Sequence, residues 1–264
     1  MRLKLFQVDA FTDRLFKGNP AAVVPLAEWP ETKLLQQIAA ENNLSETAFF
    51  VKRSDIFELR WFTPTVEIDL CGHATLAAAW VLQTELGESA NPLRFSTRSG
   101  ELRVSASGEF LTLDFPSRTP ISCAAPEALA AALGLTRGEV LAAEVLEAED
   151  LIVVLKCESD VKRITPNFTA MRELPLRGVV VTAPGDAVDF VSRWFGPKVG
   201  VDEDPVTGSA HTSLTPYWAA RTGKARLDAR QISDRGGSLV CELVGDRVRL
   251  SGAAVTYLRG EITV

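Results

Sequence analysis

The strongest constraint on the fold is a short pattern that occurs once in each half of the chain. Residues 61–74 read WFTPTVEIDLCGHA, and residues 194–210 read WFGPKVGVDEDPVTGSA. Both place an aromatic pair, a proline, an acidic segment and a glycine in that order before a segment with helical character. Gly72 and Gly208 are 136 positions apart, about half the chain. Because internal repeats determine architecture, the pattern predicts two similar halves, each offering a helix N-terminus to a shared cleft. Chance similarity is the alternative for a match this short.

The second copy has the residue types of a site for proton transfer. Pro205 disfavours the α region for the residue before it, so Asp204 is expected to be extended. Gly208 and Ser209 then begin a helix whose first amides have no partner within the helix. A carboxylate beside free amides and a positive dipole end suits a small anionic substrate that undergoes proton transfer. An ordinary surface loop with a helix cap is the more common meaning of such residues.

A helix predicted over residues 73–82 carries no charge and is apolar on nearly every face. Such a helix is buried all round, and strands at 93–96, 101–106 and 110–115 would wrap it. Residues 116–126 are rich in Pro, Ser and Ala and mark a domain boundary. Further strands are predicted at 140–146 and 254–264, and a helix from Ser209 to Arg221 with Gly223 as its stop. The predicted domains are 1–117, joined by the last strand at about 254–264, and 118–253, with the active site in the cleft between them.

Composition excludes several classes of protein. With 264 residues, 46% hydrophobic and 23% charged, the chain is typical of a globular protein. No run of about 18 apolar residues indicates a membrane span. The net charge of −6 without a basic stripe argues against nucleic acid. A start without a long apolar region or cleavage site predicts a cytoplasmic protein.

The cysteines and histidines match no metal-site spacing. Four cysteines, far apart and without a CxxC pair, are expected to be reduced thiols. Only two histidines are present, and neither belongs to a metal-ligand pattern. We therefore predict no metal and no organic cofactor.

Five short motifs, taken together and in order, resemble the PhzF-like family of phenazine-biosynthesis isomerases, which has the diaminopimelate epimerase fold. The motifs are FQVDAF at 6–11, GNPAAV at 18–23, SET at 45–47, CGHAT at 71–75 and EDPVTGSA at 203–210. The resemblance implies an α+β fold of two pseudo-symmetric halves. Each half would be a mostly antiparallel sheet wrapped around a central apolar helix. The family resemblance bears strongly on the fold and hardly at all on the substrate.

The resemblance also implies a cofactor-free isomerase in which Glu46 is the acid/base, with His73 and Asp204 beside it. Glu46 taken alone is one of 34 acidic residues and would be interpreted as solvated. His73 at a free helix terminus could donate a hydrogen bond to a developing enolate, although a lone histidine is often a satisfied core group. Asp204 could hold the substrate or its water, or serve only as an anion at a helix end. The expected substrate-binding residues are Asn19, Gly72, Ala74, Gly208 and Ser209, whereas His211 is expected to pack or cap.

Cys71 leaves an alternative open. Two-cysteine epimerases of this fold have one cysteine before the helix of each half, and Cys71 fits the first position. The second half has Thr207 before Gly208, which disfavours a two-thiol racemase, although a Cys71–Asp204 pair stays open. Cys71 as a small buried residue is at least as plausible.

The sequence therefore predicts an isomerase that moves a proton, and in some reactions a double bond, in a small carboxylate-bearing metabolite. A cysteine-dependent racemase and a non-catalytic metabolite-binding protein are the alternatives. The expected partner is a small anionic metabolite, without nucleic acid or membrane, and a homodimer is an assembly that the sequence allows.

Overall fold

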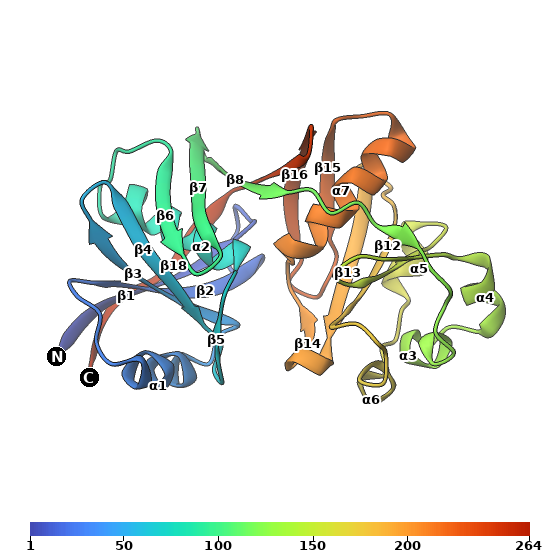
Figure 1. The fold of residues 1–264 in the computed structure, drawn as a ribbon, viewed down its shortest axis with the longest axis horizontal. Coiled ribbons are helices and arrows are strands. Elements are labelled where there is room, and N and C mark those ends of the chain that lie inside the picture. Colours follow the sequence, from blue (N-terminus) through green and yellow to red (C-terminus); the bar gives the residue numbers. More distant parts are fainter. The chain divides into compact units, whose positions relative to one another are not determined.

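The computed structural model describes residues 1–264, and these residues form two compact units (Figure 1). Unit 1 comprises Met1–Asp114 and Leu250–Val264, and unit 2 comprises Phe115–Arg249. The last strand of the chain therefore belongs to the unit that contains the first. None of the helices is both long enough and apolar enough to cross a membrane.

Unit 1 is a mixed, mostly antiparallel sheet. Its strands are β1 Arg2–Ala10, β2 Asn19–Leu26, β3 Glu46–Arg53, β4 Ile56–Phe62, β5 Glu67–Ile68, β6 Leu93–Thr97, β7 Gly100–Ser107, β8 Phe110–Pro116 and β18 Ala254–Thr263. The pairs β1–β18, β1–β2, β3–β4, β4–β5, β6–β7 and β7–β8 are antiparallel. The pairs β2–β3 and β4–β6 are parallel.

The helices of unit 1 differ in how deeply they are buried. In α2, Gly72–Trp80, every residue from His73 to Ala79 is buried, and the π-helical turn η1, Val81–Glu85, continues it. The central helix is therefore apolar and enclosed, as predicted. By contrast, α1, Thr32–Asn42, buries one stripe that includes Leu35 and Ile38. That stripe packs in a core cluster with Phe49 and other residues of the sheet.

Unit 2 has the same order and direction of strands. They are β9 Ile121–Ser122, β10 Glu144–Glu147, β11 Leu151–Val154, β12 Val179–Pro184, β13 Phe190–Gly196, β14 Val201–Asp204, β15 Arg226–Gln231, β16 Gly237–Val244 and β17 Arg247–Gly252. The pairs β10–β11, β12–β13, β13–β14 and β15–β16 are antiparallel, and β11–β12 and β13–β15 are parallel. This sequence of pairings matches β1–β2, β3–β4, β4–β5 and β6–β7 with parallel β2–β3 and β4–β6. The predicted repeat is therefore a repeat of topology.

The helices of unit 2 are α3 Leu129–Leu133, α4 Arg137–Ala142, α5 Glu158–Lys162, α6 Phe168–Met171, the 3-10 turn η2 Pro197–Val199, and α7 Gly208–Thr222. The long helix α7 is largely buried and contains Pro216. It ends where the sequence predicts, because Gly223 adopts the left-handed conformation, with φ 74°.

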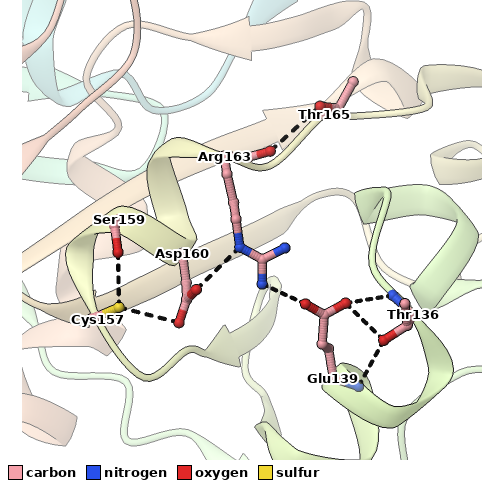
Figure 2. Close-up of polar contacts among 7 residues, drawn as sticks. All are labelled: Thr136, Glu139, Cys157, Ser159, Asp160, Arg163 and Thr165. Atoms are coloured by element: carbon pink, nitrogen blue, oxygen red, sulfur yellow. Dashed lines mark hydrogen bonds and ion pairs between the residues drawn. The ribbon is translucent and has the colours of Figure 1, made fainter.

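The strand predicted over residues 140–146 is wrong in its first part. Residues 137–142 are the helix α4, and the strand β10 begins at Glu144. The cause is a capping box, in which the Thr136 side chain accepts from the Glu139 amide and the Glu139 carboxylate accepts from the Thr136 amide. Figure 2 shows that Arg163 bridges this carboxylate to Asp160 of α5. This local cap favours a helical turn at the start of the range that was predicted to be a strand.

Candidate active site

The strand pairings define equivalent positions in the two units. In unit 1, Trp61 pairs with Ile68, and α2 begins four residues later at Gly72. In unit 2, Trp194 pairs with Asp204, and α7 begins four residues later at Gly208. The residues that precede these helices, Cys71 and Thr207, are therefore equivalent. So are the second helical residues, His73 and Ser209.

In unit 1, α2 and the start of β3 bring Glu46 and His73 together. Glu46 is the first residue of β3, and His73 is the second residue of α2. Their atoms Oε2 and Nε2 lie 3.1 Å apart, and the side chains are 13% and 6% exposed. Neither atom makes a hydrogen bond of good geometry, despite this close approach. The pair that the family resemblance implied is thus present as a close, buried carboxylate–imidazole contact.

The other imidazole nitrogen, Nδ1, faces two further side chains. Cys71 Sγ lies 3.5 Å from it, and Asn19 Nδ2 lies 3.3 Å from it. Asn19 is fully buried, and its Oδ1 accepts from Ser45 Oγ at 3.4 Å. Asn19, predicted to bind substrate, thus has a visible contact with His73 and helps to fix the orientation of the ring.

Burial and neighbouring charges perturb the two groups beside Glu46. Burial alone would lower the pKa of His73, but Cys71 and the Glu46 carboxylate outweigh it and raise this pKa well above its ordinary value. Burial, followed by the negative charge of Glu46, raises the pKa of the Cys71 thiol. Because its pKa is raised, Cys71 is a thiol at neutral pH, and the negative charge that then favours the imidazolium form of His73 is that of the Glu46 carboxylate.

This arrangement can donate and accept protons in a site that is mostly closed to water. The Glu46 carboxylate offers a proton acceptor, and the His73 imidazolium offers a donor 3.1 Å away. The first turn of α2 adds backbone amides that have no acceptor within the helix. Cys71 precedes the helix without a side-chain cap, and its carbonyl accepts from Thr75 Oγ1 at 2.5 Å. The amides of Gly72 and Ala74, predicted to bind substrate, belong to this turn.

In unit 2, Asp204 lies at the corresponding helix terminus. It is the last residue of β14, and its Oδ2 accepts from Thr207 Oγ1 at 2.5 Å. Gln231 Nε2 donates to the Asp204 carbonyl at 2.7 Å, and Gln231 Oε1 accepts from the Thr207 amide at 2.8 Å. Gln231 therefore braces the turn that carries Asp204. Sequence reasoning missed it, because nothing near Gln231 marks a partner more than twenty residues earlier.

Ser209, a predicted substrate-binding residue, receives a hydrogen bond from an arginine. Arg177 Nη2 donates to Ser209 Oγ at 2.8 Å. Arg177 also donates to both carboxylate oxygens of Asp150, at 3.0 and 3.1 Å. Sequence reasoning singled out neither Arg177 nor Asp150. Gly208, the first residue of α7, is buried.

His211 is a packing group. It is fully buried, its ring stands 5.9 Å from that of Phe190, and its Nδ1 lies 2.8 Å from the Thr207 carbonyl. Burial lowers its pKa to about 4, so it is neutral at physiological pH.

The whole chain matches known proteins. The family model described as phenazine biosynthesis-like protein matches residues 8–260. The chain belongs to the phenazine biosynthesis-like family. An uncharacterized isomerase of Pseudomonas aeruginosa is 55% identical over 262 residues, which cover 99% of each chain. A PhzF-family crystal structure from Enterococcus faecalis is 47% identical, covers 100% of both chains and superposes with a TM-score of 0.96. The family and the isomerase class, both inferred from short motifs, are thus confirmed.

The likeness in fold extends beyond the family. A probable proline racemase from Agrobacterium radiobacter is 11% identical, with a TM-score of 0.63 over 99% of this chain and 92% of that one. At this identity the comparison shows the fold alone. The predicted α+β fold of the diaminopimelate epimerase type is confirmed.

Proposed function

We propose that this isomerase moves a proton within a small carboxylate-bearing metabolite, with Glu46 as the base and His73 as the group that polarises the substrate. The observation that carries the proposal is the contact of 3.1 Å between Glu46 Oε2 and His73 Nε2 at the start of α2. Both side chains are largely buried and sit on a strand and a helix. Rigid elements hold catalytic groups in place more accurately than loops do.

The chemistry needs no cofactor in this proposal. The Glu46 carboxylate takes a proton from a carbon beside a carbonyl or carboxylate, and the electron pair moves onto oxygen as an enolate. The His73 imidazolium donates a hydrogen bond to that oxygen. The Glu46 carboxyl then returns the proton to another carbon, with a shift of the double bond, which completes the isomerisation. The first amides of α2 and the dipole of the helix favour a substrate carboxylate at this end.

Asp204 remains the proposed third catalytic group, with Gly208 and Ser209 as binding residues. Its carboxylate is oriented by Thr207 Oγ1, which supports a fixed acceptor at the start of α7. We propose that Asp204 holds the substrate or a water during proton transfer. Replacement of Asp204 by Asn should lower turnover, because the amide keeps the shape and loses the charge.

The racemase alternative rests on the thiol of Cys71. The position equivalent to Cys71 in unit 2 is Thr207, and its hydroxyl already donates to Asp204. A pair of thiols, one from each unit, therefore has no second member at this position. A mechanism with Cys71 as a single thiol is distinguished from the carboxylate mechanism by substitution.

The test is a screen of small carboxylic acids in deuterated water, with uptake of deuterium followed by mass spectrometry and NMR. Wild-type protein should exchange a carbon-bound proton of at least one compound. The Glu46→Gln variant should be slower by roughly 10²–10⁴-fold, the usual contribution of a general base. Cys71→Ser, the matched control at the same site, should retain most of the exchange.

Two outcomes would overturn the proposal. Exchange that persists in Glu46→Gln and disappears in Cys71→Ser would assign the reaction to the thiol. Tight binding of a metabolite without exchange or conversion would identify a binding protein instead. Circular dichroism of each variant excludes loss of folding as the cause.

A further inference from the structure

Glu46, Cys71 and His73 form the one group of three or more metal-ligating side chains whose donor atoms could share an ion. One donor atom from each lies within 4.8 Å of the others, and all three side chains are buried or nearly so. In addition, Glu46 Oε2 and His73 Nε2 are buried atoms without a hydrogen bond of good geometry. Buried polar atoms usually have such a partner, so these two atoms are open to a further ligand.

We propose that these three side chains form a binding site for a zinc-class divalent cation, which enters in place of the substrate and not as a cofactor. Its expected effect on turnover rests on the function proposed above, whereas the binding itself does not. A bound ion would occupy both the base and the polarising group, so the metal-bound form would be inactive and reversible by a chelator.

The distances agree with a tetrahedral ion. Zinc–oxygen and zinc–nitrogen bonds of about 2.1 Å place a carboxylate oxygen and an imidazole nitrogen about 3.4 Å apart in a tetrahedral site. Glu46 Oε2 and His73 Nε2, the two atoms without a hydrogen bond of good geometry, lie close to this separation, at 3.1 Å. Cys71 lies beside the same ring, with Sγ 3.5 Å from Nδ1, and the thiol is within 4.8 Å of a donor atom of each of the other two residues.

The donor set selects the kind of ion. Thiolate and imidazole suit zinc, whereas magnesium and calcium prefer all-oxygen sites. Three protein ligands leave a fourth position for water, as in open zinc sites. With the ion at Nε2, Asn19 Nδ2 contacts the other ring nitrogen, Nδ1, at 3.3 Å, the kind of outer contact that orients ligating histidines.

The other cysteines show what the site requires. Cys157 Sγ lies 3.3 Å from Asp160 Oδ2 and 3.0 Å from Ser159 Oγ (Figure 2), but Cys157 belongs to no group of three metal-ligating side chains. Asp160 is already paired with Arg163. Cys157 is therefore a thiol beside a carboxylate without the third ligand, which makes it the matched control.

The experiment is a titration of the reduced protein with Co²⁺, which replaces zinc and reports its ligands by absorption. Wild-type protein should bind one equivalent and develop a thiolate-to-cobalt charge-transfer band, which Zn²⁺ then abolishes by displacement. Cys71→Ser should lose the band, and Glu46→Gln should weaken binding by at least about 10-fold. Cys157→Ser should leave both unchanged. Wild-type protein that develops no charge-transfer band, or a band that survives in Cys71→Ser, would overturn the proposal.

A second arm separates metal binding from catalysis. Once a substrate is found, Zn²⁺ should block deuterium exchange at one equivalent, and EDTA should restore it. If the protein with Co²⁺ bound, as shown by the cobalt band, still catalyses full deuterium exchange, the proposal that the bound ion blocks the reaction is refuted. Absence of exchange in the untreated enzyme would instead count against the proposed reaction, and the spectrum would still decide the metal site.

Discussion

The N-terminus of α2 in unit 1 and that of α7 in unit 2 follow equivalent strands, but the reactive side chains around them differ. Each helix begins four residues after the partner of an equivalent tryptophan, Trp61 or Trp194. In unit 1 the surrounding positions supply an acid, a base and a thiol. In unit 2 they supply hydroxyls, an arginine and a carboxylate from the turn itself. The comparison teaches that topology and helix termini were preserved while the reactive groups were not.

Unit 2 has no room for a carboxylate at the position that is equivalent to Glu46 of unit 1. Thr47 pairs with Phe62, and Val179 pairs with Phe195, so the residue equivalent to Glu46 is Gly178. A Cβ at Gly178 would lie 2.7 Å from the Trp194 ring. The indole thus occupies the space into which a carboxylate would extend. The preceding residue, Arg177, takes over the contact with the helix by donating to Ser209.

One ion pair between an arginine and a glutamate occurs at equivalent positions of both units. Arg60 donates to both oxygens of Glu67 at 2.7 and 2.8 Å, and Arg193 donates to both oxygens of Glu203 at 2.8 and 2.9 Å. Each pair braces the short strand that leads to the helix. Each arginine also lies over the aromatic residue two positions later, at 5.2 and 4.8 Å from the ring centroid.

The largest expected effect concerns a pair of equivalent residues, Thr75 and His211. Each contacts the carbonyl of the residue before its helix, but only the histidine titrates. Burial lowers the pKa of His211 from 6.5 to about 4. As pH falls through this window, the unfolded chain binds a proton that the folded chain does not, so the free energy of unfolding decreases. The full loss is on the order of 3 kcal/mol below pH 4.

The His211→Asn variant isolates this contribution, because the amide can still donate to the Thr207 carbonyl. Urea unfolding of both proteins between pH 7 and about pH 4 should show a smaller decline in the variant. Carboxylates titrate in both proteins and cancel in the difference. Parallel declines would mean that His211 is not protonated on unfolding in this range.

A smaller effect is expected when the space at Gly178 is filled. Gly178→Ala places a methyl group 2.7 Å from the Trp194 ring and 2.9 Å from the Phe195 carbonyl. Overpacking of this kind costs about 1–3 kcal/mol, measurable by denaturant unfolding. Gly138→Ala in α4 is the control, because its nearest atom is 4.0 Å away and alanine favours helices. Equal results for the two variants would show that the indole does not restrict this position.

Much of the scaffold was predictable, because it depends on local signals. The uncharged stretch after Gly72 indicated a buried helix, and Gly223 marked a helix end. The repeated aromatic, proline and glycine pattern indicated two equivalent units. The capping box of Thr136 and Glu139 is also a local signal, and it marks the start of the helix α4, which was not predicted from the sequence.

The contacts that complete the candidate sites were not predictable, because they join distant positions. Asn19 meets His73 across 54 residues, and Arg177 meets Ser209 across 32. No spacing rule identifies such partners in a single sequence. The family motifs indicated Glu46 and His73, while the buried position of Asn19 beside the imidazole came only from three-dimensional packing.

The smallest expected effects test whether the two ion pairs, Arg60–Glu67 and Arg193–Glu203, contribute equally to the free energy of unfolding. Glu67→Gln and Glu203→Gln each keep the shape and remove the charge, and each should cost about 1 kcal/mol, the upper range for partly exposed ion pairs. The side chains are similarly shielded, 20% and 11% exposed in one pair and 13% and 21% in the other. Glu67 should be slightly the more sensitive, because Arg98 Nη2 also lies 2.8 Å from it.

The Arg98→Gln variant measures that extra contact alone. Arg98 is 55% exposed, so its loss should change the free energy of unfolding by less than about half a kcal/mol. Denaturant unfolding of the three variants should then place Glu67→Gln and Glu203→Gln within about half a kcal/mol of each other. A loss of several kcal/mol on replacing one glutamate and no loss on replacing the other would show that only one unit depends on its ion pair. The two units would then share their topology but not the interactions that stabilise it.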